Sequence, residues 1–413
     1  MNETIPIPIP RSVAEVIRRI EDAGFEACIV GGSVRDSLMG RPVHDYDLTT
    51  SALPGEMLAI FSKEGDRVLP TGIKHGTLSV KSGGDWLEIT TYRVDGRYSD
   101  GRHPDSVVFS RALGDDLSRR DFTVNAMAYS DRTGLVDLFG GRADLSARVI
   151  RCVGDPTERF TEDALRILRA FRFAAKLGFS IDPDTLRAAT ELRGRLSMIA
   201  VERIAKELDG LLEAADPAPV LRAAYNCGVL GVILPDAAEY FAGGERFAPL
   251  AAARPEAALR LGILLRGIGR EAAEACVRRL KYSNDTIKKV LAAATFPLPA
   301  DGGEISLRRY AGAYGGHAAT VLEAAAARGE RLPDGTPAAE ALNRLEEVLK
   351  SGAPMTLRDL AVNGSDLTSA GLTHGRETGK MLAALLDAVL SDPTLNEREK
   401  LLALALQKSK ETK

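Results

Sequence analysis

The sequence predicts an α+β protein, in which a mixed head of strands and helices precedes a long region made of helices alone. Strand signals, short apolar runs bounded by turn residues, are confined to roughly the first 145 residues. Beyond them, apolar residues recur with a period of about 3.6, and Pro and Gly separate the segments. At roughly 150 residues per domain, a chain of 413 residues has room for two or three domains.

These signals divide the chain into four expected parts. They are a head over 1–145, a helical neck over 146–210, a helical body over 211–335 and a helical tail over 336–413. In the head we expect helices at 12–23 and from 33–38, and strands at 25–30, 46–48, 77–80, 86–92, 107–109 and 135–138. The Ser-Gly-Gly-Asp segment between 77–80 and 86–92 predicts a hairpin. The later helices are expected at 160–177, 198–213, 217–229, 255–268, 270–281, 284–294, 337–350 and 376–390, with the last seven residues as a solvated tail.

Composition excludes several classes of protein. The chain is 45% hydrophobic and 27% charged, which is typical of a folded globular protein. No apolar run reaches the length of a membrane span, and the first ten residues do not resemble a secretory signal. Four cysteines without a close pair and five scattered histidines fit a reduced, cytoplasmic setting and do not predict structural zinc. We expect the cysteines and Trp86 to be packing residues.

The charge balance bears on nucleic-acid binding. Lys and Arg number 54 against 57 Asp and Glu, a formal net charge of −3. This balance argues against indiscriminate binding of nucleic acid, but a local basic stripe is enough to bind RNA.

The first cluster of polar residues begins at Gly31-Gly32, where a strand is expected to run into a helix. Such a turn brings backbone N–H groups close to a phosphate, and Arg35 in the first helical turn can donate to its oxygens. Asp45 and Asp47 follow, two residues apart, so that on an extended chain they share a face. Two close carboxylates repel one another unless a cation lies between them, and oxygen ligands with substrate phosphates suit Mg²⁺.

A third carboxylate is expected for a site with two metal ions. Glu88 is the candidate, because it is a charged residue in the middle of an expected strand, on the face of Trp86 and Thr90.

The motifs Gly-Gly-Ser-Val-Arg-Asp at 31–36 and Asp-Tyr-Asp-Leu-Thr-Thr at 45–50 resemble those of the nucleotidyltransferase superfamily that includes DNA polymerase β. More narrowly, they resemble the class II tRNA nucleotidyltransferases (CCA-adding enzymes) and the bacterial poly(A) polymerases. The resemblance implies a polymerase β-like head in which Asp45 and Asp47 bind Mg²⁺. It also implies that an RNA 3′-hydroxyl attacks the α-phosphate of a nucleotide.

The second cluster is Arg119-Arg120-Asp121-Phe-Thr-Val-Asn125, just before an expected apolar helix start. Arginine can hold a triphosphate, and Asp121 and Asn125 can hydrogen-bond a ribose hydroxyl. The segment resembles the second motif of the family, which implies that Arg120 binds the nucleotide.

The third cluster lies on the expected helix at 160–177, where Ala164, Ile167, Leu168, Phe171 and Ala175 form an apolar stripe. Asp163, Arg166, Arg169 and Arg172 cross the opposite side in steps of three. A carboxylate beside a guanidinium is complementary to cytosine and adenine and repels uracil and guanine. Asp163 and Arg166 supply that pair, which leaves Arg169 and Arg172 for phosphates or for orienting the pair. The resemblance implies the same, with these residues contacting ATP and CTP.

Three weaker signals remain. The Gly-rich segment 93–105, with Arg97, Arg102 and His103, resembles a family loop linked to the switch from C to A addition. Asn363-Gly-Ser-Asp366-Leu fits a helix cap and also resembles a family motif in the tail, where tRNA is gripped. Several basic residues of the helices could contact an RNA backbone, although each can equally be a solvated charge: Arg203, Lys206, Arg278, Arg279, Lys281, Lys288 and Lys289.

Together these features predict an enzyme that adds CCA to the 3′ end of tRNA from CTP and ATP, with Mg²⁺ and without a template. The helices beyond residue 200 are expected to recognise the acceptor arm by shape and phosphate contacts, with no DNA or membrane partner. A poly(A) polymerase and an A-only or CC-only tRNA enzyme share the motifs and stay open as alternatives. A non-catalytic RNA-binding protein on the same head is a further alternative, which the intact Asp45 and Asp47 disfavour.

Overall fold

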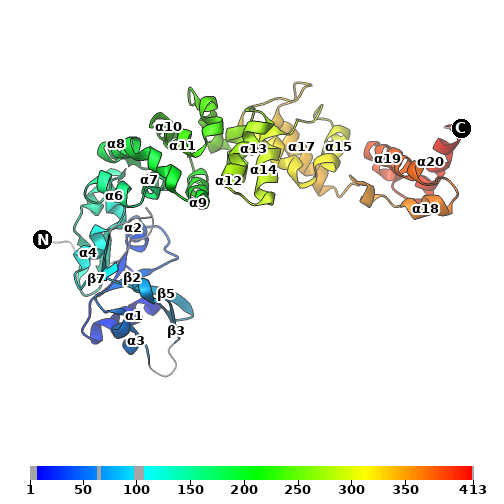
Figure 1. Ribbon diagram of the computed structural model, residues 1–413. Coiled ribbons are helices and arrows are strands. Elements are labelled where there is room, and N and C mark those ends of the chain that lie inside the picture. The colour runs from blue at the N-terminus through cyan, green and yellow to red at the C-terminus, as the bar shows by residue number, and fades with distance from the viewer. Residues whose placement is uncertain (1–6, 63–66, 97–106, 412–413) are drawn as a thin grey trace. The chain divides into compact units, whose positions relative to one another are not determined.

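The computed structural model describes residues 7–62, 67–96 and 107–411 (Figure 1). The chain forms two compact units, Met1–Pro235 and Asp236–Lys413. The first unit contains all three polar clusters of the sequence, and the second is helical throughout its described residues. The finer division into neck, body and tail stays a prediction.

The first unit is built around a mixed sheet, which confirms the α+β class. Its described strands follow the order β3-β4-β5-β2-β1-β8-β9. They are β1 (Ala27–Val30), β2 (Asp47–Thr50), β3 (Val68–Gly72), β4 (Thr77–Ser82), β5 (Asp85–Thr91), β8 (Met127–Ser130) and β9 (Gly134–Asp137). The pairing of β2 with β5 is parallel, and the other neighbours are antiparallel.

Helices cover the two faces of this sheet differently. α1 (Arg11–Asp22) and α3 (Pro54–Ile60) pack on one face, where Ile29 and Leu48 join their apolar side chains in one core (Figure 1). α4 (Leu113–Ser118) packs on the other face, where Leu117 meets Cys28 and Val30 of β1. This division follows from the strand itself, because successive side chains point to opposite faces.

The predicted hairpin is confirmed. β4 pairs with β5 along its whole length, and Gly83 and Gly84 form the turn with φ of 60° and 100°. Two positive φ values in a two-residue turn match the right-handed twist of the strands, and glycine adopts them without strain.

Several expected boundaries in the head were wrong. The segment after Asp121 is a 3₁₀ turn, η2 (Thr123–Asn125), followed by strand β8, where a helix was expected. The prediction did not include β3, β8 or the short strands β6 (Arg93–Asp95), β10 (Val149–Ile150) and β11 (Ser180–Ile181). The predicted strand β7 (Val107–Phe109) pairs with β6, and the other described helices of this part are α2 (Gly32–Leu38) and α5 (Gly141–Ala147).

The predicted helix at 160–177 is in fact two helices. α6 (Pro156–Glu162) ends at Asp163, whose backbone is extended with φ −137° and ψ 104°, and α7 (Leu165–Leu177) begins two residues later. The predicted apolar stripe is buried as expected. The first unit continues with α8 (Pro183–Leu192), α9 (Val201–Leu212), α10 (Ala218–Asn226) and α11 (Val229–Ile233).

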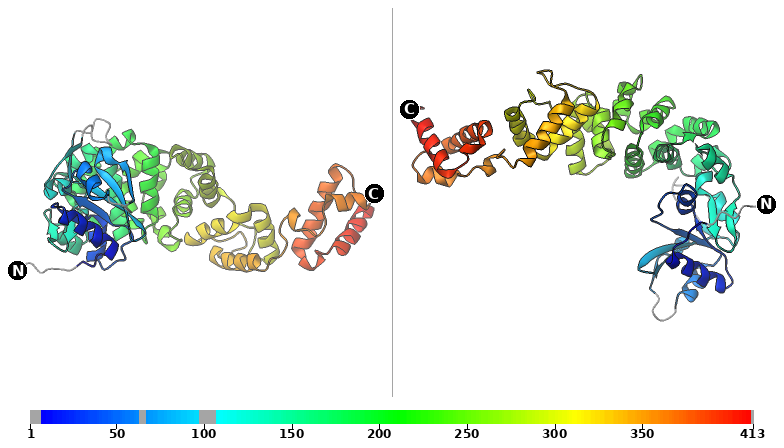
Figure 2. Two further views of the ribbon diagram at one scale, coloured as in Figure 1. Left: turned by 90° about the horizontal axis from the view of Figure 1, so that it is seen from below. Right: turned by 180° about the vertical axis from the view of Figure 1, so that it is seen from behind.

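Two apolar clusters lie among the described residues of the C-terminal part of the second unit. One joins α14 to α17 around Leu307, Val321 and Leu345, and the other joins α18 to α20 around Leu367 and Leu385, the yellow-to-orange and red helices of Figure 2. The helices are α12 (Ala257–Leu265), α13 (Arg270–Arg279), α14 (Asn284–Thr295), α15 (Glu304–Tyr314), α16 (Ala318–Ala327), α17 (Ala338–Lys350), α18 (Gly364–Ser369), α19 (Arg376–Ser391) and α20 (Arg398–Glu411).

All five helices predicted beyond residue 250 are present, whereas α15, α16, α18 and α20 were not predicted. The last seven residues, expected as a solvated tail, continue α20 as far as Glu411, and the side chains of 407–410 are exposed or half-buried. Within the described residues, no helix combines the length and the apolar character needed to cross a membrane.

The predicted packing residues divide into two cases. The four cysteines are buried and unpaired, as expected. Trp86 was predicted wrongly, because it is 45% exposed on the outward face of β5, two residues from Glu88.

Candidate functional site

The two strands that carry the carboxylates lie side by side. β2 and β5 are parallel neighbours, and Asp47 is in register with Glu88. Partners in register project from the same face, so the two carboxylates are neighbours although they lie far apart in the sequence. Both residues are exposed, and Asp45 lies just before β2, as it does relative to the expected strand at 46–48.

These side chains line an open cavity of about 650 Å³, together with His44 and Trp86. Partial removal from water raises the pKa of the Asp47 carboxyl; Arg120 opposes this shift, and Asp45 adds to it. Across the described ranges, no three His, Cys, Asp or Glu side chains converge closely enough to hold a metal ion by themselves. Further ligands, such as phosphate oxygens, are therefore needed to complete a metal site here.

The glycine turn and Arg120 are in contact. Gly31 has φ 75°, and a Cβ at this position would lie 3.1 Å from Nη1 of Arg120. Only glycine combines this backbone conformation with such a close approach. The first and second clusters of the sequence are therefore neighbours in the fold.

Arg120 is held from α4 with part of its donor capacity unused. Its Nη2 donates to Asp116 at 3.0 Å, while its buried Nε has no hydrogen-bond partner among the described residues. Asp116 also accepts from Arg119. A buried guanidinium N–H without a protein partner is costly, which favours a ligand oxygen at this position.

A chain of hydrogen bonds joins all three clusters. Nη1 of Arg35 donates to Oδ1 of Asn125 at 2.6 Å, and Nδ2 of Asn125 donates to Oδ1 of Asp121 at 3.2 Å. The other oxygen of Asp121 accepts from Nε of Arg169 on α7 at 2.8 Å. Burial alone would raise the pKa of the Asp121 carboxyl, but Arg169 and Asn125 hold it below its ordinary value.

This network occupies several of the hydrogen-bond donors of Arg35. Arg35 is buried, and its Nε and Nη2 donate to Asp36 while Nη1 donates to Asn125. We expected it to donate to a phosphate, and these three bonds leave two of its five N–H groups for such a contact. In this structure Arg35 joins α2 to η2.

The predicted pair of Asp163 and Arg166 is divided between other partners. Nη1 of Arg166 donates to Glu162 at 2.5 Å, and Nη2 donates to the carbonyl of Arg119 at 2.9 Å. Oδ2 of Asp163 accepts from Nη2 of Arg203 at 2.9 Å. The helix break at Asp163 is the reason, because the two residues no longer lie on one continuous helix face.

Arg172 pairs with Glu207 of α9, and its guanidinium lies 4.2 Å from the ring centre of Phe173. The guanidinium groups of Arg35 and Arg169 also lie over this ring. Sequence reasoning missed Phe173, Asp116 and Glu207. The spacing of Asp116 from Arg119 and Arg120, three and four residues, was the available signal for one of them.

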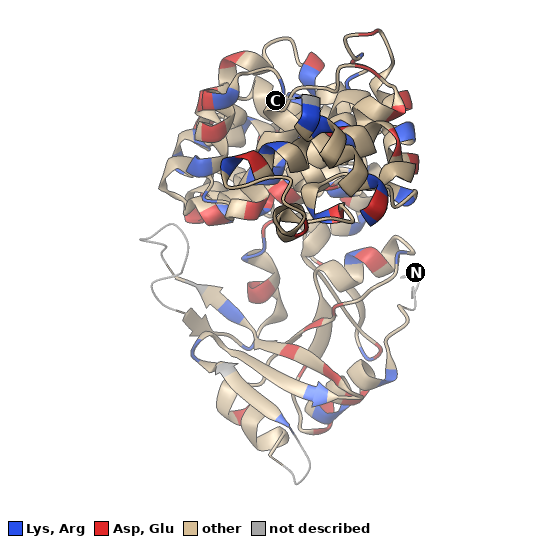
Figure 3. Cartoon of the chain, turned by 90° about the vertical axis from the view of Figure 1, so that its right-hand side faces the viewer, with Lys and Arg blue, Asp and Glu red and all other residues tan. Residues whose placement is uncertain are grey.

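Several residues of the weaker sequence signals form hydrogen bonds or ion pairs within the protein. Asn363 caps α18 by accepting from the backbone N–H groups of Ser365 and Asp366, as a helix cap should. Arg278, Arg279 and Lys289 pair with Glu274, Asp236 and Glu256. Figure 3 shows Lys and Arg interspersed with Asp and Glu over the helices. Arg97, Arg102 and His103 of the predicted loop lie outside the described residues.

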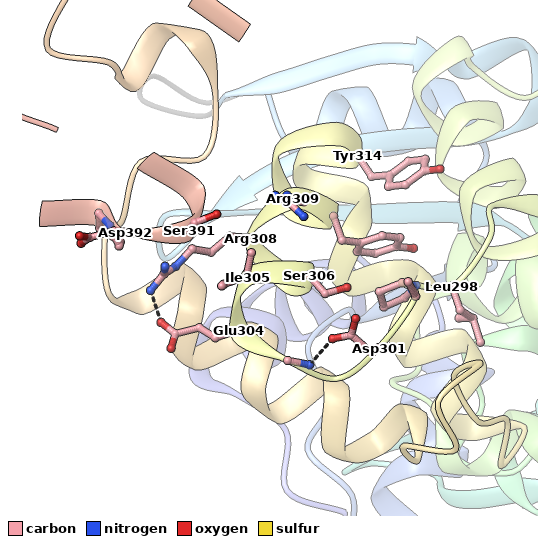
Figure 4. Close-up of a pocket in the computed structure, with 15 residues that line it drawn as sticks. Leu298, Asp301, Glu304, Ile305, Ser306, Arg308, Arg309, Tyr314, Ser391 and Asp392 are labelled. Carbon is pink, nitrogen blue, oxygen red and sulfur yellow. Dashed lines mark hydrogen bonds and ion pairs between the residues drawn. The ribbon is translucent and has the colours of Figure 1, made fainter. Parts of the chain in front are cut away.

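The most voluminous of the described cavities lies elsewhere. It measures about 870 Å³ and lies in the second unit, between α15 and the end of α19 (Figure 4). Its lining mixes acids, bases and apolar residues, with Glu304 paired to Arg308, and includes no residue of the three clusters. We therefore place the chemistry in the first unit.

Family models match most of the chain. The Poly A polymerase head domain matches residues 27–151, and the probable RNA and SrmB-binding site of polymerase A matches 178–241. The putative tRNA nucleotidyltransferase domain 2 matches 256–405.

Known relatives are similar over nearly the full length. The CCA-adding enzyme of Limosilactobacillus fermentum is 38% identical over 412 residues, which cover 98% of this chain and 98% of that protein. The CCA-adding enzyme of Latilactobacillus sakei subsp. sakei is 38% identical over 399 residues, covering 94% and 96%. The crystal structure of the Bacillus stearothermophilus CCA-adding enzyme in complex with CTP is 31% identical, covers 97% of this chain and 98% of that chain, and superposes with a TM-score of 0.78.

Proposed function

The chain belongs to the family of CCA-adding enzymes, which are nucleotidyltransferases, and from this premise we propose that it completes the 3′ end of tRNA. It adds C, C and A from CTP and ATP without a template and releases pyrophosphate. The observation that carries this proposal is the hydrogen-bonded chain from Arg35 through Asn125 and Asp121 to Arg169. These hydrogen bonds link the glycine turn to α7, the helix next to the residues proposed to recognise the base.

Enzymes of this family depend on a metal ion, and we propose Mg²⁺ for this chain. Asp45 and Asp47 would hold it, with Glu88 as the third carboxylate. The donor set fits, because it consists of exposed carboxylate groups on, or just before, the neighbouring central strands β2 and β5. When bound, the ion supplies a positive charge that activates the RNA 3′-hydroxyl and neutralises the triphosphate.

The nucleotide phosphates are assigned to Gly32 and Arg120. The turn after β1 leaves room for close approach of an anion, and the unpartnered Nε of Arg120 supplies a donor. Arg35 is assigned a supporting role, because three of its five N–H groups already donate to Asp36 and Asn125. Because phosphoryl transfer needs little covalent help, positioning and charge stabilisation account for most of the catalysis.

Base choice is assigned to Asp163 and Arg166. An acceptor and a donor match the amine and ring nitrogen of cytosine and adenine, and they oppose the carbonyl and N–H of uracil and guanine. In this structure both Nη atoms of Arg166 donate to other groups, namely Glu162 and the Arg119 carbonyl. Arg169 and Arg172, paired with Asp121 and Glu207, fix α7 to its neighbours, and their remaining N–H groups are assigned to phosphates. The helices beyond residue 200 contact the acceptor arm of tRNA by shape.

The direct test uses a tRNA transcript that lacks its last three nucleotides, incubated with Mg²⁺ and each nucleoside triphosphate alone and together. We expect two additions with CTP alone, three followed by a stop with CTP and ATP, and none with UTP or GTP. A long A ladder on unrelated RNA would instead identify a poly(A) polymerase. Addition of A alone or of C alone would identify a partial-CCA enzyme.

The Asp45→Ala variant separates an enzyme from an RNA-binding protein. We expect incorporation to fall by about a thousandfold or more, because a metal ligand is lost, while binding of tRNA survives. Gel-shift and incorporation assays on the same preparation measure both. Loss of tRNA binding in parallel with activity would contradict this assignment.

A further inference from the structure

The single tryptophan of the chain lies beside the carboxylates of the first unit. Trp86 and Glu88 are two residues apart on β5, so their exposed side chains project from the same face of the sheet. Trp86 also lines the same cavity as Asp45 and Asp47. An isolated exposed apolar side chain is common on folded proteins and needs no explanation. A large exposed ring beside three carboxylates does, because it gains little from burial in the free protein.

The strands next to β5 extend this face with basic and apolar side chains. Lys81 of β4 lies directly opposite Trp86, and its backbone N–H donates to the carbonyl of Arg67 at 2.9 Å. Arg67, Lys81 and Trp86 therefore form one row across the sheet. Leu69, two residues after Arg67, is exposed on the same face. An aromatic ring flanked by basic side chains is typical of sites for single-stranded nucleic acid, where the ring stacks on a base and the charges attract the backbone phosphates.

The order of the strands separates this row from the proposed phosphate site. β2 lies between β1 and β5 in the sheet. The glycine turn assigned to the triphosphate follows β1, whereas Trp86 lies on β5, so the carboxylates of β2 lie between the two. In phosphoryl transfer the attacking and leaving oxygens are roughly in line. If pyrophosphate leaves on the β1 side, the RNA 3′-hydroxyl has to attack from the β5 side, where Trp86 lies.

We propose that Trp86 stacks on the terminal base of the RNA 3′ end and so holds the attacking hydroxyl beside Asp45 and Asp47. The inference rests on the proposed function and deepens it, because it names a contact with the RNA substrate and not with the incoming nucleotide. Every base has a flat π face, so stacking accepts whichever base ends the RNA. The terminal base changes with each addition, and a contact that tolerates any base serves all three steps.

Because the chain contains one tryptophan, its fluorescence reports this contact directly. In Mg²⁺ without nucleotide, titration of the full-length chain with tRNA lacking its last three nucleotides should quench the emission, since a stacked base quenches an indole. The matched RNA has the same backbone with an abasic 3′-terminal nucleotide, and it should bind with little quenching. CTP alone should leave the emission unchanged. Equal quenching by the two RNAs, or quenching by CTP alone, would overturn the proposal.

Kinetics of the first addition give a second test. For Trp86→Ala we expect kcat/KM for tRNA to fall by about tenfold, while the KM for CTP at saturating tRNA stays within about twofold of wild type. Trp86→Phe keeps a ring and should recover most of the loss. The control is Leu138→Ala, which shortens an exposed apolar side chain just after β9, at the other edge of the sheet, and should change neither constant.

The outcomes separate this proposal from the proposed function. An unchanged kcat/KM for tRNA in Trp86→Ala would refute the stacking contact in a chain that still adds CCA. If a variant fails to fold, as monitored by circular dichroism, the fluorescence of wild type decides. A wild-type chain that adds neither C nor A would instead refute the proposed function.

Discussion

At the scale of single residues, the site depends on carboxylates buried against arginines. Asp116 is fully buried on α4 and accepts hydrogen bonds from both Arg119 and Arg120. Burial alone would raise the pKa of its carboxyl, but the two guanidinium groups hold it below its ordinary value. The carboxylate is thereby kept charged, and it orients the arginine proposed to bind the triphosphate.

Removing this carboxylate should be costly, because two partly buried guanidinium groups lose their common partner. For Asp116→Ala we expect the free energy of unfolding to fall by about 3 kcal/mol, measured by urea titration at neutral pH. Asp184→Ala, which breaks an exposed pair with Arg187, should change it by less than about 0.5 kcal/mol. A similar effect of the two substitutions would contradict the role of burial.

Asp121 gives a pH-dependent prediction. Its pKa in the folded chain lies below the ordinary 3.8 because Arg169 and Asn125 outweigh the effect of burial. Its stabilisation is therefore fully present above the unfolded pKa and is lost as the pH falls through the lower, folded value. Urea unfolding of wild type and Asp121→Asn should differ most at neutral pH, and the difference should shrink below about pH 4. A difference that grew in acid would exclude this linkage.

At the scale of elements, close helix packing in the second unit requires one particular glycine. Gly262 lies on α12, and a Cβ there would come within 2.4 Å of the Cβ of Ala293 on α14 and within 2.9 Å of the Val290 carbonyl. The atoms of α14 in this contact are a Cβ and a backbone oxygen, and neither can swing aside as the end of a long side chain can. A Cβ added at Gly262 would therefore push the two helices apart.

Gly262→Ala should therefore destabilise the chain by about 1–3 kcal/mol despite the higher helix propensity of alanine. Gly379→Ala on α19 is the control, since nothing lies within 4 Å of its Cβ position. There the propensity gain should stabilise the helix by up to about 1 kcal/mol. Thermal melts of both variants test the contrast, and a stabilising Gly262→Ala would disprove the close contact.

At the scale of the whole molecule, charge is balanced and largely paired. The net charge is −3, and basic residues of the helices such as Arg278 and Arg279 have acidic partners. Non-specific attraction to phosphates is therefore weak, and recognition of RNA has to depend on shape and on 2′-hydroxyl contacts.

Binding should accordingly discriminate between nucleic acids. We expect the chain to bind tRNA lacking its last three nucleotides about tenfold or more tighter than a DNA duplex with the sequence of the acceptor stem. Affinity for both should fall as salt rises from about 50 to about 200 mM. Filter binding at these salt concentrations tests this expectation, and equal affinity for the two would point to a charge-driven mode.

The sequence by itself determined the features that depend on local spacing. The Gly-Gly-Asp turn specified the hairpin of β4 and β5, the alternation along β5 exposed Glu88, and the apolar period of α7 specified its buried stripe. The order of motifs likewise indicated the family, because the motif residues lie in local turns and at strand ends that their spacing specifies.

Only the tertiary structure decided which groups meet. β8 is buried along its whole length, so it lacks the alternation by which a strand is recognised in sequence. The helix break at Asp163 and its pairing with Arg203, forty residues away, depend on how α7 and α9 pack. An ion pair between distant residues leaves no periodic trace in the sequence, because the fold and not the spacing brings its partners together.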